Sequence, residues 1–186
     1  MSELDVSLEF TPNPNTLKYV VNQPLLEKGA ANYTSLESAS NSPLAQKLLS
    51  VEGIVGVMIG RNFITVSKND AGDWEKIYQT GLQTITNHLK DGLKVVEGEI
   101  SGSTDKHESA TGEIETKIKK ILDDEIRPAV AMDGGDITFD KYQDGVVYLF
   151  LQGSCSGCPS STMTLKMGIE TRLKEAIPEI KEVVAI

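Results

Sequence analysis

The sequence is poor in cysteine, histidine and aromatic residues. It has two cysteines and two histidines in 186 residues, and aromatic side chains make up 5%. Acidic residues outnumber basic ones by 27 to 18, so we expect no basic surface for phosphate and no nucleic acid partner. No apolar run approaches the roughly 20 residues that cross a bilayer, so we expect no membrane partner either.

The first residues show no targeting pattern. They are Met-Ser-Glu-Leu-Asp-Val, without the order of a secretory signal or the arginine-rich composition of a transit peptide. We therefore expect a cytoplasmic protein, or one of an organelle matrix if the chain is a processed form. In a reducing compartment, a close pair of cysteines is more often a metal or redox site than a structural disulfide.

Both cysteines lie in one short stretch. Cys155 and Cys158 are separated by two residues, so both sulfurs can turn toward one metal centre or close one small disulfide. Pro159 suits the first position of a helix, and the hydroxyl residues 160–162 suit its first turn. We expect the cysteines at a helix N-terminus, where the helix dipole lowers thiol pKa values and favours the metal-binding thiolate.

Residues 1–98 have the pattern of a small mixed domain. We predict strands at 6–10, 16–21, 54–59 and 62–67, one more near Tyr33, and a last one at 93–96. Helices are predicted at 43–50 and from Asp73 to Gly92, the second with one buried stripe made of Trp74, Ile77, Tyr78, Leu82, Ile85 and Leu89. Residues 11–15 favour a rigid turn, with a partner-docking corner as the alternative.

Residues 99–112 are polar, contain glycine and lack periodicity, so we expect a flexible linker. His107 lies in this linker and His88 in the preceding helix. Neither histidine has a neighbouring ligand at chelating spacing, so we expect both to be solvated rather than bound to metal.

Residues 113–186 predict a second small domain. A helix at 114–126 should end or bend at Arg127-Pro128, and strands at 137–142 and 146–151 flank Asp144-Gly145, a strong hairpin signal. A helix at 159–176 and a strand at 183–186 complete the order helix, strand, strand, helix, strand. The fold class is therefore α+β, with two small α/β-sandwich domains joined by the linker, and two helices on one face of the second sheet.

Asp133 and Asp136 enclose two glycines. Paired carboxylates can form an acid/base pair or a hard-metal site, but no third ligand or basic partner lies near them in sequence. We therefore expect a turn at residues 133–136.

The number of available ligands limits how the cysteine pair can bind a metal. Structural zinc sites and common iron-sulfur clusters need four protein ligands, whereas this chain offers two cysteines and no nearby histidine. A closed site therefore needs a symmetric homodimer with Cys155 and Cys158 from both chains. A zinc-stapled structural dimer and a thioredoxin-like dithiol-disulfide oxidoreductase, with Cys155 as the attacking thiolate, remain alternatives.

Several longer motifs carry a family resemblance. Residues 127–128, 133–136, 145–147, 164–170 and above all Leu-Gln-Gly-Ser-Cys-Ser-Gly-Cys-Pro-Ser-Ser at 151–161 resemble the C-terminal domain of NifU and the Nfu iron-sulfur carriers. Residues 11–19, 42–45 and 60–64 are similar to the Nfu N-terminal domain. The resemblance implies a scaffold or carrier, not an enzyme.

In that family reading, Cys155 and Cys158 of two protomers bind a bridging [4Fe-4S] cluster, or a [2Fe-2S] form. The cluster is received from upstream assembly proteins and passed to apo target proteins. We expect a homodimer with the cluster and a monomer without it. The first domain has no cysteine, so we assign it by exclusion to partner selection.

Four more residues receive roles around the cysteines. Gly153 and Gly157 let the loop backbone approach the cluster and direct N–H groups at its sulfurs. Met163 and Met167 lie on a different side of the last helix from its leucine stripe. We expect them to be gap-filling core residues, with a place in the dimer contact as the alternative.

Overall fold

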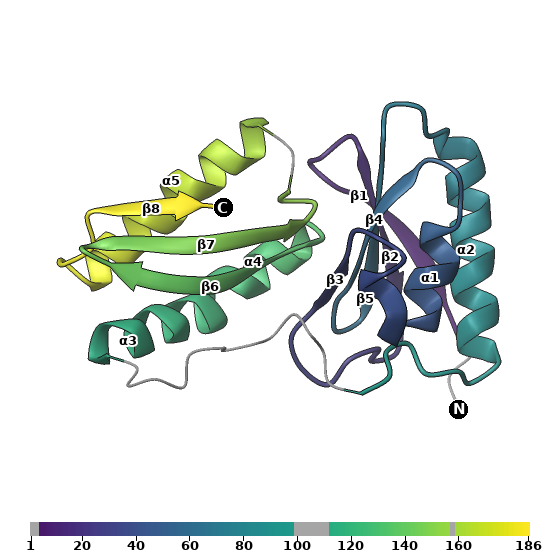
Figure 1. Ribbon diagram of the computed structural model, residues 1–186, viewed down its shortest axis with the longest axis horizontal. Helices are drawn as coiled ribbons and strands as arrows, with labels where there is room; N and C mark the ends of the chain where they lie inside the picture. The colour runs from purple at the N-terminus through teal and green to yellow at the C-terminus, as the bar shows by residue number, and fades with distance from the viewer. Residues whose placement is uncertain (1–3, 99–111, 157–158) are drawn as a thin grey trace. The chain divides into compact units, whose positions relative to one another are not determined.

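The computed structural model describes residues 4–98, 112–156 and 159–186, and the chain divides into two compact units, residues 1–103 and 104–186. Each unit contains one β-sheet with helices (Figure 1), which confirms the predicted α+β class. The predicted linker at 99–112 lies almost entirely outside the described residues. Within the described part of the chain, no helix is long and apolar enough to span a membrane.

The first unit is built on a five-stranded antiparallel sheet in the order β1-β2-β5-β4-β3. The predicted strands other than the one at 93–96 are confirmed, with ends within one residue of the predicted bounds, and a short strand lies at Tyr33 as predicted. They are β1 (Val6–Phe10), β2 (Thr16–Val21), β3 (Ala31–Tyr33), β4 (Ile54–Ile59) and β5 (Phe63–Lys68). Figure 1 shows helices α1 (Pro43–Leu49) and α2 (Trp74–Lys90) on the same face of this sheet.

Side-chain caps set the start of both helices. The hydroxyl of Ser42 accepts a hydrogen bond from the N–H of Ala45 at 3.1 Å, and the carboxylate of Asp73 accepts one from Glu75 at 2.9 Å. Each cap satisfies an N–H group that the helix itself leaves without a partner. The predicted helix starts are therefore confirmed.

The buried stripe of α2 differs in part from the prediction. Ile77 and Ile85 are fully buried, but Tyr78 is exposed. Gly81, and not Tyr78, belongs to the buried side of the helix. The hydroxyl of Tyr19 packs against Gly81, 2.5 Å from the position that a β-carbon on Gly81 would take. The same hydroxyl donates to the carbonyl oxygens of Ile77 and Tyr78.

The predictions of a strand at 93–96 and of a solvated His88 are wrong. The segment after α2 folds back on the loop before α1, where Glu97 N–H donates to Asn41 and Ser42 Oγ donates to the carbonyl of Val95. These bonds replace strand pairing. The fold-back also covers His88, which is 1% exposed and has its Nε2 3.0 Å from the carbonyl oxygen of Lys94.

The second unit has a three-stranded sheet, β6 (Gly135–Gln143), β7 (Val146–Gly153) and β8 (Glu182–Ala185). β6 and β7 are antiparallel, and β8 pairs parallel to β7 after the crossover helix α5 (Pro159–Ala176). Asp144 and Gly145 both have positive φ, 54° and 88°, as the predicted primed hairpin turn requires.

The first helix of this unit changes its winding near Pro128. α3 (Glu113–Ile121) passes into a π-helical turn (Leu122–Ile126) and then α4 (Arg127–Met132). The N–H of Arg127 donates to the carbonyl of Leu122, five residues back. A proline lacks the N–H for the ordinary helical bond, and a π turn accommodates that loss. The predicted change at Arg127-Pro128 is therefore a local rewinding, after which the helix continues.

The helices of the second unit cover one face of its sheet, as predicted. Side chains from the helices and from alternating strand positions form one buried cluster, whose members include Ile118, Leu122, Ile169, Leu173, Ile137, Val147, Leu149 and Val183. Phe150, which alternates with Leu149, is exposed. Figure 1 shows α5 running behind the strands of this sheet.

Candidate metal centre

Cys155 lies two residues beyond the end of β7, and its side chain is only 6% exposed. It belongs to the same buried cluster as the sheet and helix side chains of the second unit. Gly157 and Cys158 lie outside the described residues. The structure therefore places one of the two predicted ligands.

The loop that carries Cys155 is held to the turn before β6. Gly135 and Gly153 are paired at the ends of β6 and β7, and Ser154 N–H donates to the carbonyl of Gly134 at 3.1 Å. Ser154 Oγ also donates to the carbonyl of Asp133, at 2.5 Å. Gly134 and Gly153 have φ of 79° and 64°, a conformation that favours glycine. The two segments thus form one hydrogen-bonded unit.

Gly135 is needed for its small size. A β-carbon at this position would collide with the Sγ of Cys155 and lie 3.1 Å from both the carbonyl oxygen of Gln152 and a methyl group of Val130. The backbone of β6 therefore forms one wall around the thiol. From sequence, Gly135 has only a turn role, because the contact with Cys155 joins residues that are distant in the chain.

The carboxylate of Asp136 is bound by Arg127 in a two-point ion pair. Arg127 Nε lies 2.8 Å from Oδ1 and the second guanidinium nitrogen 2.9 Å from Oδ2, while a third contact reaches Asp123. Asp136 is buried, so the pair fixes the start of β6 to α4. The turn prediction fits Asp133, and Asp136 serves as a structural anion. Its partner was missed because only the fold brings Arg127 beside it.

The prediction of a lowered thiol pKa is wrong for Cys155. Burial raises its pKa to about 11, the carboxylates of Asp133 and Asp136 add to the rise, and a hydrogen bond with Ser154 acts in the opposite direction. The dipole of α5 alone would lower the pKa of the thiol, but desolvation in the core favours the neutral thiol and outweighs it. Before metal binds, Cys155 keeps its proton at neutral pH.

The remaining candidate ligands do not gather at this site. Among the residues that the structure describes, no group of three or more histidine, cysteine, aspartate or glutamate side chains could hold a metal ion. His88 is in the first unit, and His107 lies outside the described residues.

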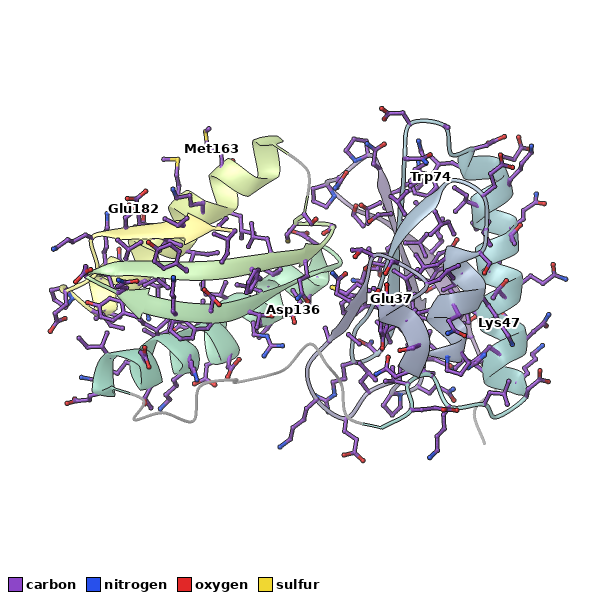
Figure 2. All side chains as sticks on the ribbon, viewed as in Figure 1. Glu37, Lys47, Trp74, Asp136, Met163 and Glu182 are labelled. Carbon is purple, nitrogen blue, oxygen red and sulfur yellow. The ribbon has the colours of Figure 1, made fainter. Side chains whose placement is uncertain are left out.

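Met163 and Met167 are not core residues. Their side chains are 67% and 64% exposed on the outward face of α5, and Figure 2 shows Met163 pointing away from the helix. Ile169 and Leu173 supply the inward face instead. The prediction that the two methionines fill gaps in the core is wrong.

Family models match both units. The model described as NifU-like domain matches residues 118–184, and the model described as Scaffold protein Nfu/NifU N terminal matches residues 6–92. The chain belongs to the Nfu family of NifU-like scaffold proteins.

Particular relatives span nearly all of the chain. The human protein "NFU1 iron-sulfur cluster scaffold homolog, mitochondrial" is 41% identical over 180 residues, which are 96% of this chain and 70% of that protein. A Drosophila willistoni protein of the same name is 39% identical over 96% of this chain and 62% of its own length. The solution structure of a NifU-like protein from Saccharomyces cerevisiae is 24% identical, with a TM-score of 0.47 over 53% of this chain and 92% of that chain.

Proposed function

We propose that this chain is an iron-sulfur cluster carrier that holds its cargo through Cys155 and Cys158 of two protomers. The observation that carries the proposal is the position of Cys155, walled by glycine backbone at the end of β7. It belongs to a chain with only one other cysteine, three residues away. Four sulfurs around one cluster then require a second copy of the chain.

The cargo is a [4Fe-4S] cluster, with a [2Fe-2S] form bound by the same four thiolates. Each thiol gives up its proton when it ligates iron, so cluster uptake releases protons. We expect backbone N–H groups of the cysteine loop, that of Gly153 among them, to stabilise the negative charge of the cluster sulfurs. Upstream assembly proteins deliver the cluster.

Release follows from the shared site. Because each chain contributes two of four ligands, separation of the chains leaves the cluster half coordinated, and thiolates of an apo target protein can replace the lost ligands. The cluster is passed on by exchange of its thiolate ligands, and the protein catalyses no chemical conversion of it. We therefore class the protein as a carrier rather than an enzyme. A monomer should remain after transfer.

Partner selection falls to the first unit. Phe10 is 87% exposed at the end of β1 and precedes the corner at residues 11–15. Hydrogen bonds fix this corner, among them Trp74 Nε1 to the carbonyl of Pro14 at 3.1 Å and Lys68 N–H to the carbonyl of Asn15 at 2.9 Å. A rigid corner beside an exposed aromatic side chain loses little entropy on docking.

The location we propose is an organelle matrix, with the cytoplasm as the alternative. The human and fly relatives are named as mitochondrial proteins. Either compartment is reducing, which keeps the two cysteines available for metal.

The oxidoreductase alternative needs Cys155 as an attacking thiolate at working pH, and the burial that raises the pKa of this thiol works against that role. Iron binding meets the same cost, so the reconstituted protein, and not the pKa, distinguishes the two functions. The colour of the loaded protein distinguishes the zinc alternative from the carrier, because a zinc site is colourless. Anaerobic addition of ferrous iron and sulfide should give a brown protein with the visible absorption of an iron-sulfur cluster, and Cys155→Ser or Cys158→Ser should prevent it. A colourless product that binds zinc alone would refute the carrier.

A further inference from the structure

The outward face of α5 carries Met163, Met167 and Gly168 near the start of the helix, and exposed threonines at 164 and 171 lie beside them. Both methionines are exposed, and a β-carbon on Gly168 would meet nothing within 4 Å. Met163 and Met167 are four residues apart, so they lie on the same side of the helix.

This face adjoins the cysteine loop. Pro159, the first residue of α5, directly follows Cys158 in sequence. At about 1.5 Å of rise per residue, Met163 lies about 6 Å and Met167 about 12 Å along the helix axis from Pro159. A second chain that brings its own sulfurs to the same cluster must come within this range.

Charge also favours contact between identical copies here. Residues 145–165 contain no charged side chain, although 24% of the chain is charged and its net charge is −9. Two copies of so acidic a protein repel each other over most of their surface. The stretch that includes the cysteines and the first turns of α5 is where that repulsion is weakest.

We propose that the outward face of α5 is the contact between the two copies of this chain in the cluster-bound dimer, an inference that rests on the carrier function proposed above. In a two-fold dimer the same patch appears on both subunits and must complement itself, which an uncharged, adaptable methionine surface does. Two side chains offer at most a few hundred Å² of apolar surface, well below the roughly 800 Å² per partner of a standard interface. The contact therefore supports the dimer only together with the shared cluster.

The test is the double variant Met163→Lys/Met167→Lys of the full chain, loaded anaerobically with iron and sulfide. Four added lysines would face one another across the two-fold axis. We expect the dissociation constant of the loaded dimer to rise at least tenfold, with faster cluster loss. Met163→Leu/Met167→Leu, which keeps the surface apolar, should behave as the wild type. Circular dichroism of the cluster-free variants checks that exposed substitutions leave the fold intact.

The matched control adds the same charge elsewhere. Thr116 and Gln143 are exposed in the same unit, and Gln143 lies at the hairpin end of β6, roughly 20 Å of strand from the cysteine loop. Thr116→Lys/Gln143→Lys should not raise the dissociation constant, because added positive charge away from the contact only reduces the repulsion between two acidic chains. Molar mass across a dilution series gives the readout.

The outcomes distinguish failure of the dimer contact from failure of the carrier function. A loaded wild-type dimer together with an equally tight double-lysine dimer overturns this inference and leaves the carrier function standing. An unchanged dimer with slower transfer to an apo ferredoxin also overturns it, because the face would then meet the acceptor. A wild-type chain that takes up no cluster removes the carrier function and this inference together.

Discussion

The Sγ atom of Cys155 occupies the space that a β-carbon on Gly135 would need. The side chain of Cys155 and the backbone of β6 therefore fit together. Burial of the thiol depends on the small size of Gly135, twenty positions earlier in the sequence. This contact links the stability of the second unit to the position of the metal ligand.

Gly135→Ala should push Cys155 out of place and lower the stability of the second unit. Inserting a methyl group into a filled site costs about 1–3 kcal/mol. Native-state hydrogen exchange of β6 and β7 in the cluster-free protein measures the free energy of opening. Gly168→Ala is the control: its β-carbon meets open space, so it should stabilise α5 by about 0.5–1 kcal/mol. Equal stability of Gly135→Ala and wild type would contradict the packing account.

Asp136→Asn should weaken the attachment of β6 to α4. The substitution removes the charge that two guanidinium nitrogens of Arg127 contact, and Arg127 keeps only its exposed partner Asp123. We expect a loss of about 2 kcal/mol, because a partly buried cation is left with poorer pairing. The same hydrogen-exchange measurement applies.

Glu125→Gln provides the comparison for that prediction. Glu125 also forms a two-point pair with an arginine, Arg172, but both side chains are substantially exposed to water. Solvent screens such a pair, so its loss should be smaller than that of Asp136→Asn. The reverse order would show that the buried pair is not what anchors β6.

The local features of the fold were predictable from sequence, whereas the contacts around Cys155 were not. The cap residues Ser42 and Asp73 and the Asp144-Gly145 turn act within a few residues of themselves, so their effects can be identified from the sequence. The contacts of Gly135 with Cys155 and of Arg127 with Asp136 exist only after β6 pairs with β7 and α4 packs beside them. Burial of Cys155 belongs to the same class, which is why the predicted direction of its pKa shift was wrong.

Alkylation of Cys155 tests that pKa. In Cys158→Ser, the reaction rate should rise about tenfold per pH unit past the ordinary thiol range of about 8.5 and level off only near the raised pKa of about 11. Below that value the buried sulfur keeps its proton, and only the small thiolate fraction reacts. The same variant unfolded in urea should level off near the ordinary thiol pKa of about 8.5. A native profile that levels off there too would contradict the raised pKa.

Phe10→Ala should slow transfer of the cluster to an apo target protein without changing how much cluster the chain holds. An exposed aromatic anchor that is lost from an interface typically weakens it by more than 1 kcal/mol, which is about fivefold in rate or affinity. Leu36→Ala removes another exposed apolar side chain of the first unit and should have little effect. Equal transfer by Phe10→Ala and wild type would remove Phe10 from partner selection.

Exposure of helix residues was also harder to predict than helix position. The bounds of α5 agree with the sequence pattern, but Met163 and Met167 face outward because Ile169 and Leu173 already fill the space against the sheet. His88 shows the opposite error, since a segment without regular structure covers it. In both cases burial depends on what packs against the helix, which the helical period alone does not reveal.

The most direct test of the account is the iron and sulfide content per chain and the molar mass of one anaerobically loaded sample. We predict a dimer with one [4Fe-4S] cluster per two chains, which becomes a monomer when a chelator removes the iron. A brown monomer that keeps a full cluster on its own two cysteines would contradict the shared site, and a colourless monomer would contradict the carrier function.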